Sequence, residues 1–187
     1  FLKRRIREEQ YDFKGRQLYG ESELWICEPD GKNKRNLTPH LHCVFFQWSP
    51  NNRYIALAYL NYREEYKVEG DNYALGVVNV QAGELRFIDL FAPYNAGGFS
   101  FSPDGNMIAY CKPLKWELMA EWYVTDAEVF IINIDGTGKT QITETEAVEE
   151  TVKWSEDGKR LIIWQSPPDP SVKTCPEYVT ISLKKSK

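Results

Sequence analysis

The sequence predicts an all-β fold made of repeated antiparallel sheets, and three observations lead to that prediction. The chain of 187 residues is 42% hydrophobic and 14% aromatic, a composition too apolar for a disordered chain. Its apolar runs are short, rich in β-branched and aromatic residues, and separated by turn residues, as strands are. The third observation is a segment that recurs along the chain at a constant spacing.

The recurring segment is an aromatic residue followed by a serine, a polar turn and a short apolar strand. It occurs at residues 48–56 (WSPNNRYIA), 101–109 (FSPDGNMIA) and 154–162 (WSEDGKRLI), so successive copies are 53 residues apart. A degenerate copy at residues 11–19 (YDFKGRQLY) stands 37 residues before the first of these. Such self-similarity indicates supersecondary units that bury their apolar surface against one another.

A second element recurs between these copies, namely an apolar strand, a turn and a more polar strand. Residues 24–31 (LWICEPDG) and 129–136 (VFIINIDG) each lead to a Leu/Ile-Thr pair, and residues 75–83 (LGVVNVQAG) lead to a strand at 85–88. The Asp-Gly and Ala-Gly dipeptides supply the positive φ that tight hairpin turns require. Each repeat therefore has four strands, which is the make-up of one blade of a β-propeller.

These residues resemble the TolB-type propeller repeat, a relative of the WD-repeat family that is also found in the propellers of prolyl-oligopeptidase-type peptidases. The matching motifs are the WSP at 48–50, the SPDG at 102–105, the SEDG at 155–158, the Asp-Gly turns, and the Leu-Thr and Ile-Thr endings. The resemblance covers about residues 11 to 183 and implies a propeller fold and a place in the bacterial cell envelope or periplasm. It implies little about function, because one fold serves many roles.

We expect a single propeller domain over residues 1–187, with about four blades at residues 7–38, 44–90, 98–143 and 151–183. The last blade has no outer strand of its own in the sequence. Residues 2–6 would supply it by pairing beside residues 178–183, although residues 2–10 also resemble a charged helix. The alternatives are a fragment of a larger ring, or two copies that associate to close one, because open strand edges invite pairing.

Extra length falls between the second and third strands of three repeats, at residues 60–72, 112–127 and 165–177. Equivalent loops of successive blades emerge on one face, so we expect these insertions to gather there and to bind a protein partner. The alternative is that they fold back over their own blades. Residues 116–123 are predicted to form a short helix. The expected contact residues are Tyr62, Tyr66, Trp116, Met119, Trp122 and Tyr123.

The two histidines, His40 and His42, precede a predicted inner strand. In extended backbone they would point the same way, as metal ligands can, but no carboxylate stands beside them. We therefore place both in a polar binding surface at the mouth of the propeller channel. We expect no metal ligand and no cofactor.

The charge of the chain argues against a nucleic-acid partner, because 23 Lys and Arg stand against 27 Asp and Glu, a net charge of −4. The basic runs at residues 3–7 and 184–187 are solvated tails or contacts for an anionic membrane surface. The four cysteines form no Cys-x-x-Cys pair and so no zinc signature.

Motifs of catalysis are missing from the sequence. It holds no Gly-x-Ser-x-Gly elbow, no His-Glu-x-x-His helix and no phosphate-binding glycine loop. Ser49, Ser102 and Ser155 recur with the repeat and are interpreted as turn formers. We expect a non-enzymatic protein-binding scaffold. The first alternative is the substrate-gating propeller of a prolyl-oligopeptidase-type serine peptidase, and the second is a small-ligand or metal site at the channel mouth.

Overall fold

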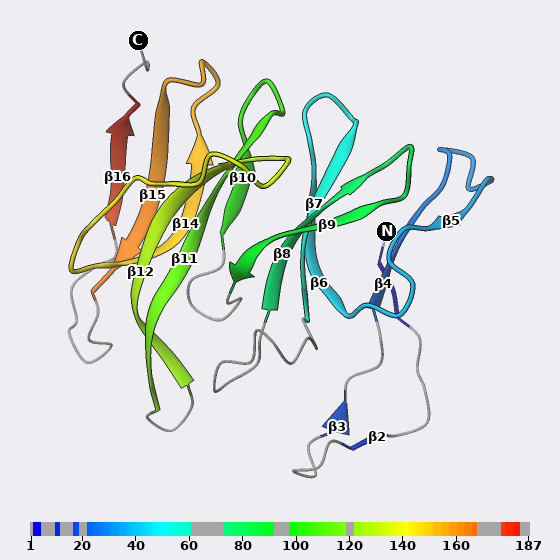
Figure 1. Cartoon of the computed structure of the whole chain (residues 1–187), viewed down its shortest axis with the longest axis horizontal. Coiled ribbons are helices and arrows are strands. Elements are labelled where there is room, and N and C mark those ends of the chain that lie inside the picture. Colours follow the sequence, from blue (N-terminus) through cyan, green and yellow to red (C-terminus); the bar gives the residue numbers. More distant parts are fainter. Residues whose placement is uncertain are drawn as a thin grey trace.

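The computed structural model in Figure 1 describes residues 2–4, 10–11, 17–18, 22–60, 73–91, 98–118, 122–167 and 177–183. Within these ranges the chain forms strands and turns and no helix, so the all-β prediction is confirmed. Accordingly, the described part has no helix long and apolar enough to cross a membrane. The sheets stand side by side, and we number them as blades one to four in chain order.

Blades two and three each have four strands. Blade two contains β6 (Cys43–Trp48), β7 (Tyr54–Leu60), β8 (Tyr73–Asn79) and β9 (Leu85–Phe91). Blade three contains β10 (Phe99–Phe101), β11 (Met107–Leu118), β12 (Trp122–Asn133) and the short β13 (Thr140–Gln141). Neighbouring strands pair antiparallel in chain order, from an inner first strand to an outer last one, which is the arrangement of propeller blades.

Blades one and four have fewer strands. Blade four contains β14 (Val148–Trp154), β15 (Arg160–Ser166) and β16 (Glu177–Ser182), and one parallel pair, Ala127 with Val148, joins it to blade three. Blade one contains β1 (Leu2–Arg4), β4 (Ser22–Ile26) and β5 (Arg35–Asn36). Figure 1 shows an arc that runs from β5 to β16, and no described strand of blade one pairs with blade four. The fold is a β-propeller in the form of a partial ring.

The N-terminal segment is not where the sequence placed it. Leu2–Arg4 pairs antiparallel with β4, in the register Leu2 with Leu24, and not beside β16. Nor does it begin a helix. The degenerate repeat at residues 11–19 coincides with a separate two-stranded ribbon of β2 (Gln10–Tyr11) and β3 (Gln17–Leu18). Since β1 lies beside β4 as β7 lies beside β8, this ribbon occupies the place between second and third strands where the other blades carry insertions.

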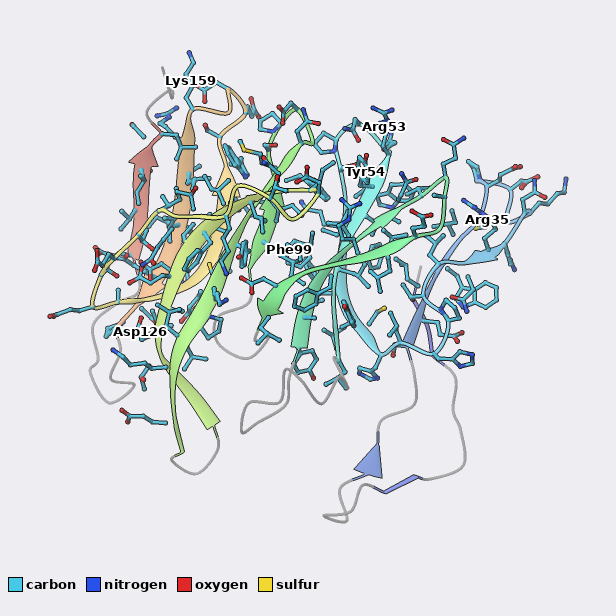
Figure 2. The ribbon with its side chains drawn as sticks, viewed as in Figure 1. Arg35, Arg53, Tyr54, Phe99, Asp126 and Lys159 are labelled. Atoms are coloured by element: carbon cyan, nitrogen blue, oxygen red, sulfur yellow. The ribbon has the colours of Figure 1, made fainter. Side chains whose placement is uncertain are left out.

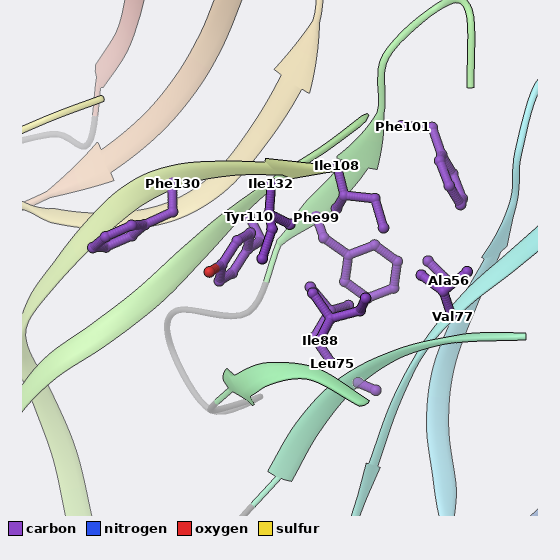
Figure 3. Close-up of a cluster of buried hydrophobic side chains, with 11 residues drawn as sticks. Ala56, Leu75, Val77, Ile88, Phe99, Phe101, Ile108, Tyr110, Phe130 and Ile132 are labelled. Atoms are coloured by element: carbon purple, nitrogen blue, oxygen red, sulfur yellow. The ribbon is translucent and has the colours of Figure 1, made fainter. Parts of the chain in front are cut away.

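The core lies between the blades. Five central residues of β7 and five of β8 are buried, because both faces of this sheet are covered. Ile55, Leu57 and Tyr59 of β7 pack in one cluster with Leu24 of blade one. The alternate residues, represented by Ala56 in Figure 3, face the side chains of blade three. A third cluster joins blades three and four. These strands are therefore continuously apolar, whereas a sheet with one solvent-exposed face would alternate apolar and polar residues.

The recurring serines form the turn between first and second strands, as predicted. In each copy the hydroxyl donates to the Asn or Asp side chain two residues on and accepts the backbone N–H five residues on, at 2.9–3.0 Å. The fourth residue of each turn has positive φ, at Asn52, Gly105 and Gly158. Hydrogen bonds from Ser102 and the Asn106 N–H hold the pKa of Asp104 below its ordinary value. These serines are structural.

The predicted helix at residues 116–123 is wrong. Residues up to Leu118 continue β11 and residues from Trp122 begin β12, and Trp116 pairs with Val124 in the register of one long hairpin. The helical spacing was carried by only three residues. Trp, Tyr, Val and Thr favour strands, and the pairing of residues 107–113 with 127–133 extends into this segment.

Replacing Gly98 tests the contact between blades three and four. Its N–H donates to Glu150 O at 2.9 Å, and a Cβ at Gly98 would lie 2.5 Å from Thr151 Cα, which is backbone and cannot yield. We expect Gly98→Ala to lower the free energy of unfolding by about 3 kcal/mol in denaturant titrations.

Gly31→Ala is the matched control. Gly31 has a φ of +80°, and no atom lies within 4 Å of an added Cβ. The free energy of unfolding of Gly31→Ala should therefore fall by only about 1 kcal/mol, which is the cost of placing alanine in a left-handed backbone conformation. Equal losses for the two variants would contradict the close inter-blade approach.

Candidate functional site

The connections between the second and third strands of the blades all lie on one side of the arc. The strand ends that they join are paired, as Leu60 with Tyr73 in blade two and Gln165 with Glu177 in blade four. Figure 1 shows these ends, the end of β11, the start of β12 and the β2–β3 ribbon on the same side. Figure 2 shows Arg53 and Lys159, from the serine turns, at the opposite end. We call the side with the long connections the insertion face.

The predicted aromatic contact residues fall partly on this face and partly outside the described residues. Trp116 in β11 and Trp122 and Tyr123 in β12 lie in the paired backbone at the end of the hairpin. Tyr62, Tyr66 and Met119 lie outside the described residues, as do the basic residues at 184–187.

The histidines also lie at the insertion face. They stand in the connection from β5 to β6, where Leu60 N donates to His42 O at 3.0 Å. His40 has a φ of +65°, so the backbone is not extended there and the expected common direction of the two side chains has lost its basis. No group of three or more His, Cys, Asp or Glu side chains in the described residues is arranged to hold a metal ion.

Two buried glutamates that the sequence interpretation missed brace the connections that lead from one blade to the next. Glu23 Oε1 accepts the N–H of His40 at 3.2 Å, and Glu128 Oε1 accepts the N–H of Thr145 at 2.7 Å. Both glutamates stand immediately before the recurring third-strand segment, at the same repeat position. This recurrence was the available signal. In each of these connections a carboxylate accepts a hydrogen bond from a backbone N–H, which fixes the backbone beneath the insertion face.

The threonines of the Leu-Thr and Ile-Thr endings complete this bracing. Thr38 Oγ1 accepts Leu24 N at 2.7 Å, and Thr143 Oγ1 accepts Val129 N at 2.8 Å. Each threonine thus satisfies the first N–H after the buried glutamate. The same hydrogen bond is thus made by the threonine in both blades, which explains why the Leu-Thr or Ile-Thr ending recurs in the sequence.

The inner strand β6 carries exposed aromatic side chains. Phe45 in β6 is 51% exposed and forms an edge-to-face pair with Phe99, the first residue of β10, with ring centroids 5.0 Å apart. Trp48, at the other end of β6, is 41% exposed. Large exposed aromatics of this kind are enriched at protein interfaces. The exposed ring of Phe45 therefore offers an apolar contact point on the inner strand β6.

An ionic cluster fastens blade two to blade three. The carboxylate of Asp89 in β9 accepts hydrogen bonds from the Tyr110 hydroxyl at 2.6 Å, from Lys112 Nζ at 2.9 Å and from Lys139 Nζ. Burial by itself would raise the pKa of Asp89, but these bonds outweigh it and hold the pKa below its ordinary value. Burial lowers the pKa of Lys112 and raises that of Tyr110. All four side chains bind one another within the cluster, so we interpret the cluster as a structural contact between blades two and three.

The comparison with known proteins bears on the fold. The chain has a TM-score of 0.61 with a putative TolB from Agrobacterium tumefaciens, at 15% identity, covering 88% of this chain and 54% of that one. TolB from Acinetobacter baumannii gives 0.56 at 17% identity over 89% and 36% of the two chains. The tricorn protease gives 0.65 at 16% identity, over 89% of this chain and 16% of that chain.

Sequence similarity to curated proteins is confined to part of the chain. Dipeptidyl-peptidase 5 of Porphyromonas endodontalis is 32% identical over 65 residues, which are 35% of this chain and 9% of that protein. Its counterpart in Porphyromonas gingivalis is 36% identical over 62 residues, again 9% of that protein. No family model matches the chain. The chain thus spans less than a tenth of the length of these relatives.

Taken with the strand order, the structural matches define the class: the chain is a β-propeller. Its strand arrangement is similar to that of the TolB propellers, in agreement with the sequence resemblance.

Removing the charge of Asp89 tests the ionic cluster. Asp89→Asn leaves the half-buried Lys112 without its anion, so we expect a loss of about 2 kcal/mol in the free energy of unfolding near neutral pH. Because the folded-state pKa of Asp89 is lowered, its contribution is present above the unfolded pKa of 3.8 and is lost as the pH falls below it.

The difference between wild type and Asp89→Asn should therefore shrink as denaturant titrations move from about pH 7 to about pH 3. Asp30→Asn, at an exposed turn, is the control and should change little at either pH. A gap that stays constant with pH would contradict the assigned role of the carboxylate.

Proposed function

We propose that this chain is a non-enzymatic protein-binding scaffold and that its insertion face receives the partner. The observation that carries the proposal is the long β11–β12 hairpin. Its strands have 12 residues each, whereas β7 and β8 have 7 each. The extra length lies at the insertion face and carries Trp116, Trp122 and Tyr123 in its sequence. Aromatic side chains have few rotatable bonds and therefore lose little conformational entropy when they bind a partner.

Two further features support a binding role for this face. Phe45, which packs edge-to-face on the buried Phe99, provides exposed apolar area near the start of β6. The buried Glu23 and Glu128 hold the neighbouring connections in place through backbone hydrogen bonds. An exposed aromatic ring and a braced backbone fit a partner that supplies its own apolar and polar groups.

The test is partner recovery from the native source with a hairpin variant. Trp116→Ala with Trp122→Ala should weaken binding of the co-purified partner at least tenfold, because truncated aromatic anchors commonly cost about 2 kcal/mol each. The affinity is measured by titrating the identified partner, and thermal unfolding checks that the fold is intact.

Trp48→Ala is the matched control. Trp48 is an aromatic residue with 41% exposure at the serine-turn end of β6, opposite the insertion face. It should leave the affinity unchanged. If the hairpin variant recovers and binds the partner as wild type does, the assignment of the insertion face is rejected.

A second candidate function is the substrate-gating propeller of a serine peptidase. It is favoured by one observation, namely that both curated sequence matches are dipeptidyl-peptidases. In that case the native polypeptide would be longer than 187 residues and would include a hydrolase domain with an activated serine.

An antibody raised against this chain separates the two candidates. The native protein is captured from its source, exposed to a fluorophosphonate probe that labels activated serines, and sized by electrophoresis. The scaffold proposal expects no labelling. A labelled polypeptide of higher mass would replace it with the peptidase.

A further inference from the structure

Two buried glutamates from different blades meet beside one threonine. Glu128 of β12 is 2% exposed and Glu149 of β14 is 0% exposed. The backbone N–H of Thr145 donates to Glu128 Oε1 at 2.7 Å, and its hydroxyl donates to Glu149 Oε1 at 3.0 Å. Both bonds end on Thr145, and the charge of Glu128 acts on the carboxyl group of Glu149, so the two groups lie near each other at the junction of blades three and four.

Each carboxyl group has a second oxygen that these bonds leave unsatisfied. Among the described residues, Glu128 Oε2 and Glu149 Oε2 are buried and have no hydrogen-bond partner. A buried carboxylate oxygen without a donor is unfavourable, and two carboxylates side by side add repulsion. One proton removes both costs, because a protonated carboxyl group donates where a carboxylate only accepts.

The strands packed against the pair supply no positive charge. Lys112 of β11 stands opposite Glu128 in register, but its ammonium group binds Asp89. Cys111 of β11 is buried, and burial raises the pKa of its thiol. No lysine or arginine in the described ranges forms a hydrogen bond or ion pair with Glu128 or Glu149.

The remaining neighbours of the pair are acidic or neutral. Glu150, next in β14, accepts a hydrogen bond from Trp164 Nε1 of β15 at 3.1 Å. Gln165 of β15, opposite Glu149 in register, donates to Glu177 of β16. The connection into β14 adds the exposed Glu144 and Glu146.

We propose that Glu128 and Glu149 share one proton, with Glu149 as the acid and Glu128 as the acceptor, and that this proton holds blade four against the connection from blade three. In this arrangement Glu149 Oε2–H donates to Glu128 Oε2. Both unsatisfied oxygens then have a partner, and the pair carries a single negative charge.

The equivalent junction between blades one and two supports a neutral group at this position. There Cys43 takes the place of Glu149, since β6 and β14 both end in Trp and both have a register shift after this residue. Its Sγ lies 3.3 Å from Thr38 Oγ1, and burial raises its pKa to about 11. The thiol therefore stays neutral beside Glu23, as the acid does beside Glu128.

The shared proton makes the junction sensitive to pH. Burial first, and then the charge of Glu128, raise the pKa of Glu149 from 4.5 to about 7. The stabilisation is complete below the unfolded pKa and is lost as the pH rises through the folded one. Over that interval the folding equilibrium constant should fall about 300-fold on account of Glu149.

The test compares wild type, Glu149→Gln and Glu144→Gln in denaturant titrations from about pH 4.5 to about pH 8. A glutamine at 149 keeps the shape of the acid and donates at every pH. We expect the wild type and the exposed control Glu144→Gln to show the pH-dependent loss, and Glu149→Gln to lack most of it. An equal pH slope in Glu149→Gln and wild type would overturn the proposal.

Infrared difference spectra give a second measurement that does not depend on stability. The carbonyl band of a protonated carboxylic acid should be present in the folded wild type near pH 6 and missing from Glu149→Gln. Its absence from the wild type would overturn the proposal. So would stabilisation of the wild type, but not of Glu149→Gln, by Ca²⁺ or Mn²⁺ near pH 8, because a cation would then occupy the site.

Discussion

Each sheet of this protein carries apolar side chains on both of its faces, and the arrangement of the whole chain follows from the need to cover them. Residues of β7 alternate between a cluster shared with blade one and a cluster shared with blade three. Each blade therefore depends on neighbouring blades to cover its apolar faces. At the end of the arc the outward side of blade four shows the constraint directly, since Ile162 is 40% exposed and Trp164 stacks edge-to-face on the largely exposed Tyr178.

The polar groups of the protein are concentrated at the two ends of the blades. At one end the serine turns close each first hairpin with side-chain hydrogen bonds and a residue of positive φ, which leaves little freedom in length. At the other end the connections are tied down by buried carboxylates and threonines at a few backbone N–H groups. The insertions lie at this end too, but between the second and third strands of a blade and not in the connections between blades that these bonds fix.

The accuracy of sequence-based prediction differed between local and long-range features. The serine turns were predictable because all their hydrogen bonds lie within six residues. The helix at residues 116–123 was mispredicted because its state is set by pairing between β11 and β12, whose partners are up to 26 residues apart in the chain. The placement of Leu2–Arg4 failed for the same reason, since its partner β4 lies beyond the β2–β3 ribbon. Glu149 was missed because its neighbour Glu128 comes from another blade.

By itself the sequence determined that the protein is an all-β propeller with recurring four-stranded units, because the repeat spacing, the turn residues and the strand composition are properties of short segments. It also determined the places where the chain inserts extra residues. Only the tertiary structure decided which strands pair across those insertions, that the arc stays open, and which charged groups meet at the junctions. These depend on burial and on contacts between blades, and desolvation acts on a carboxyl group only once its neighbours have closed over it.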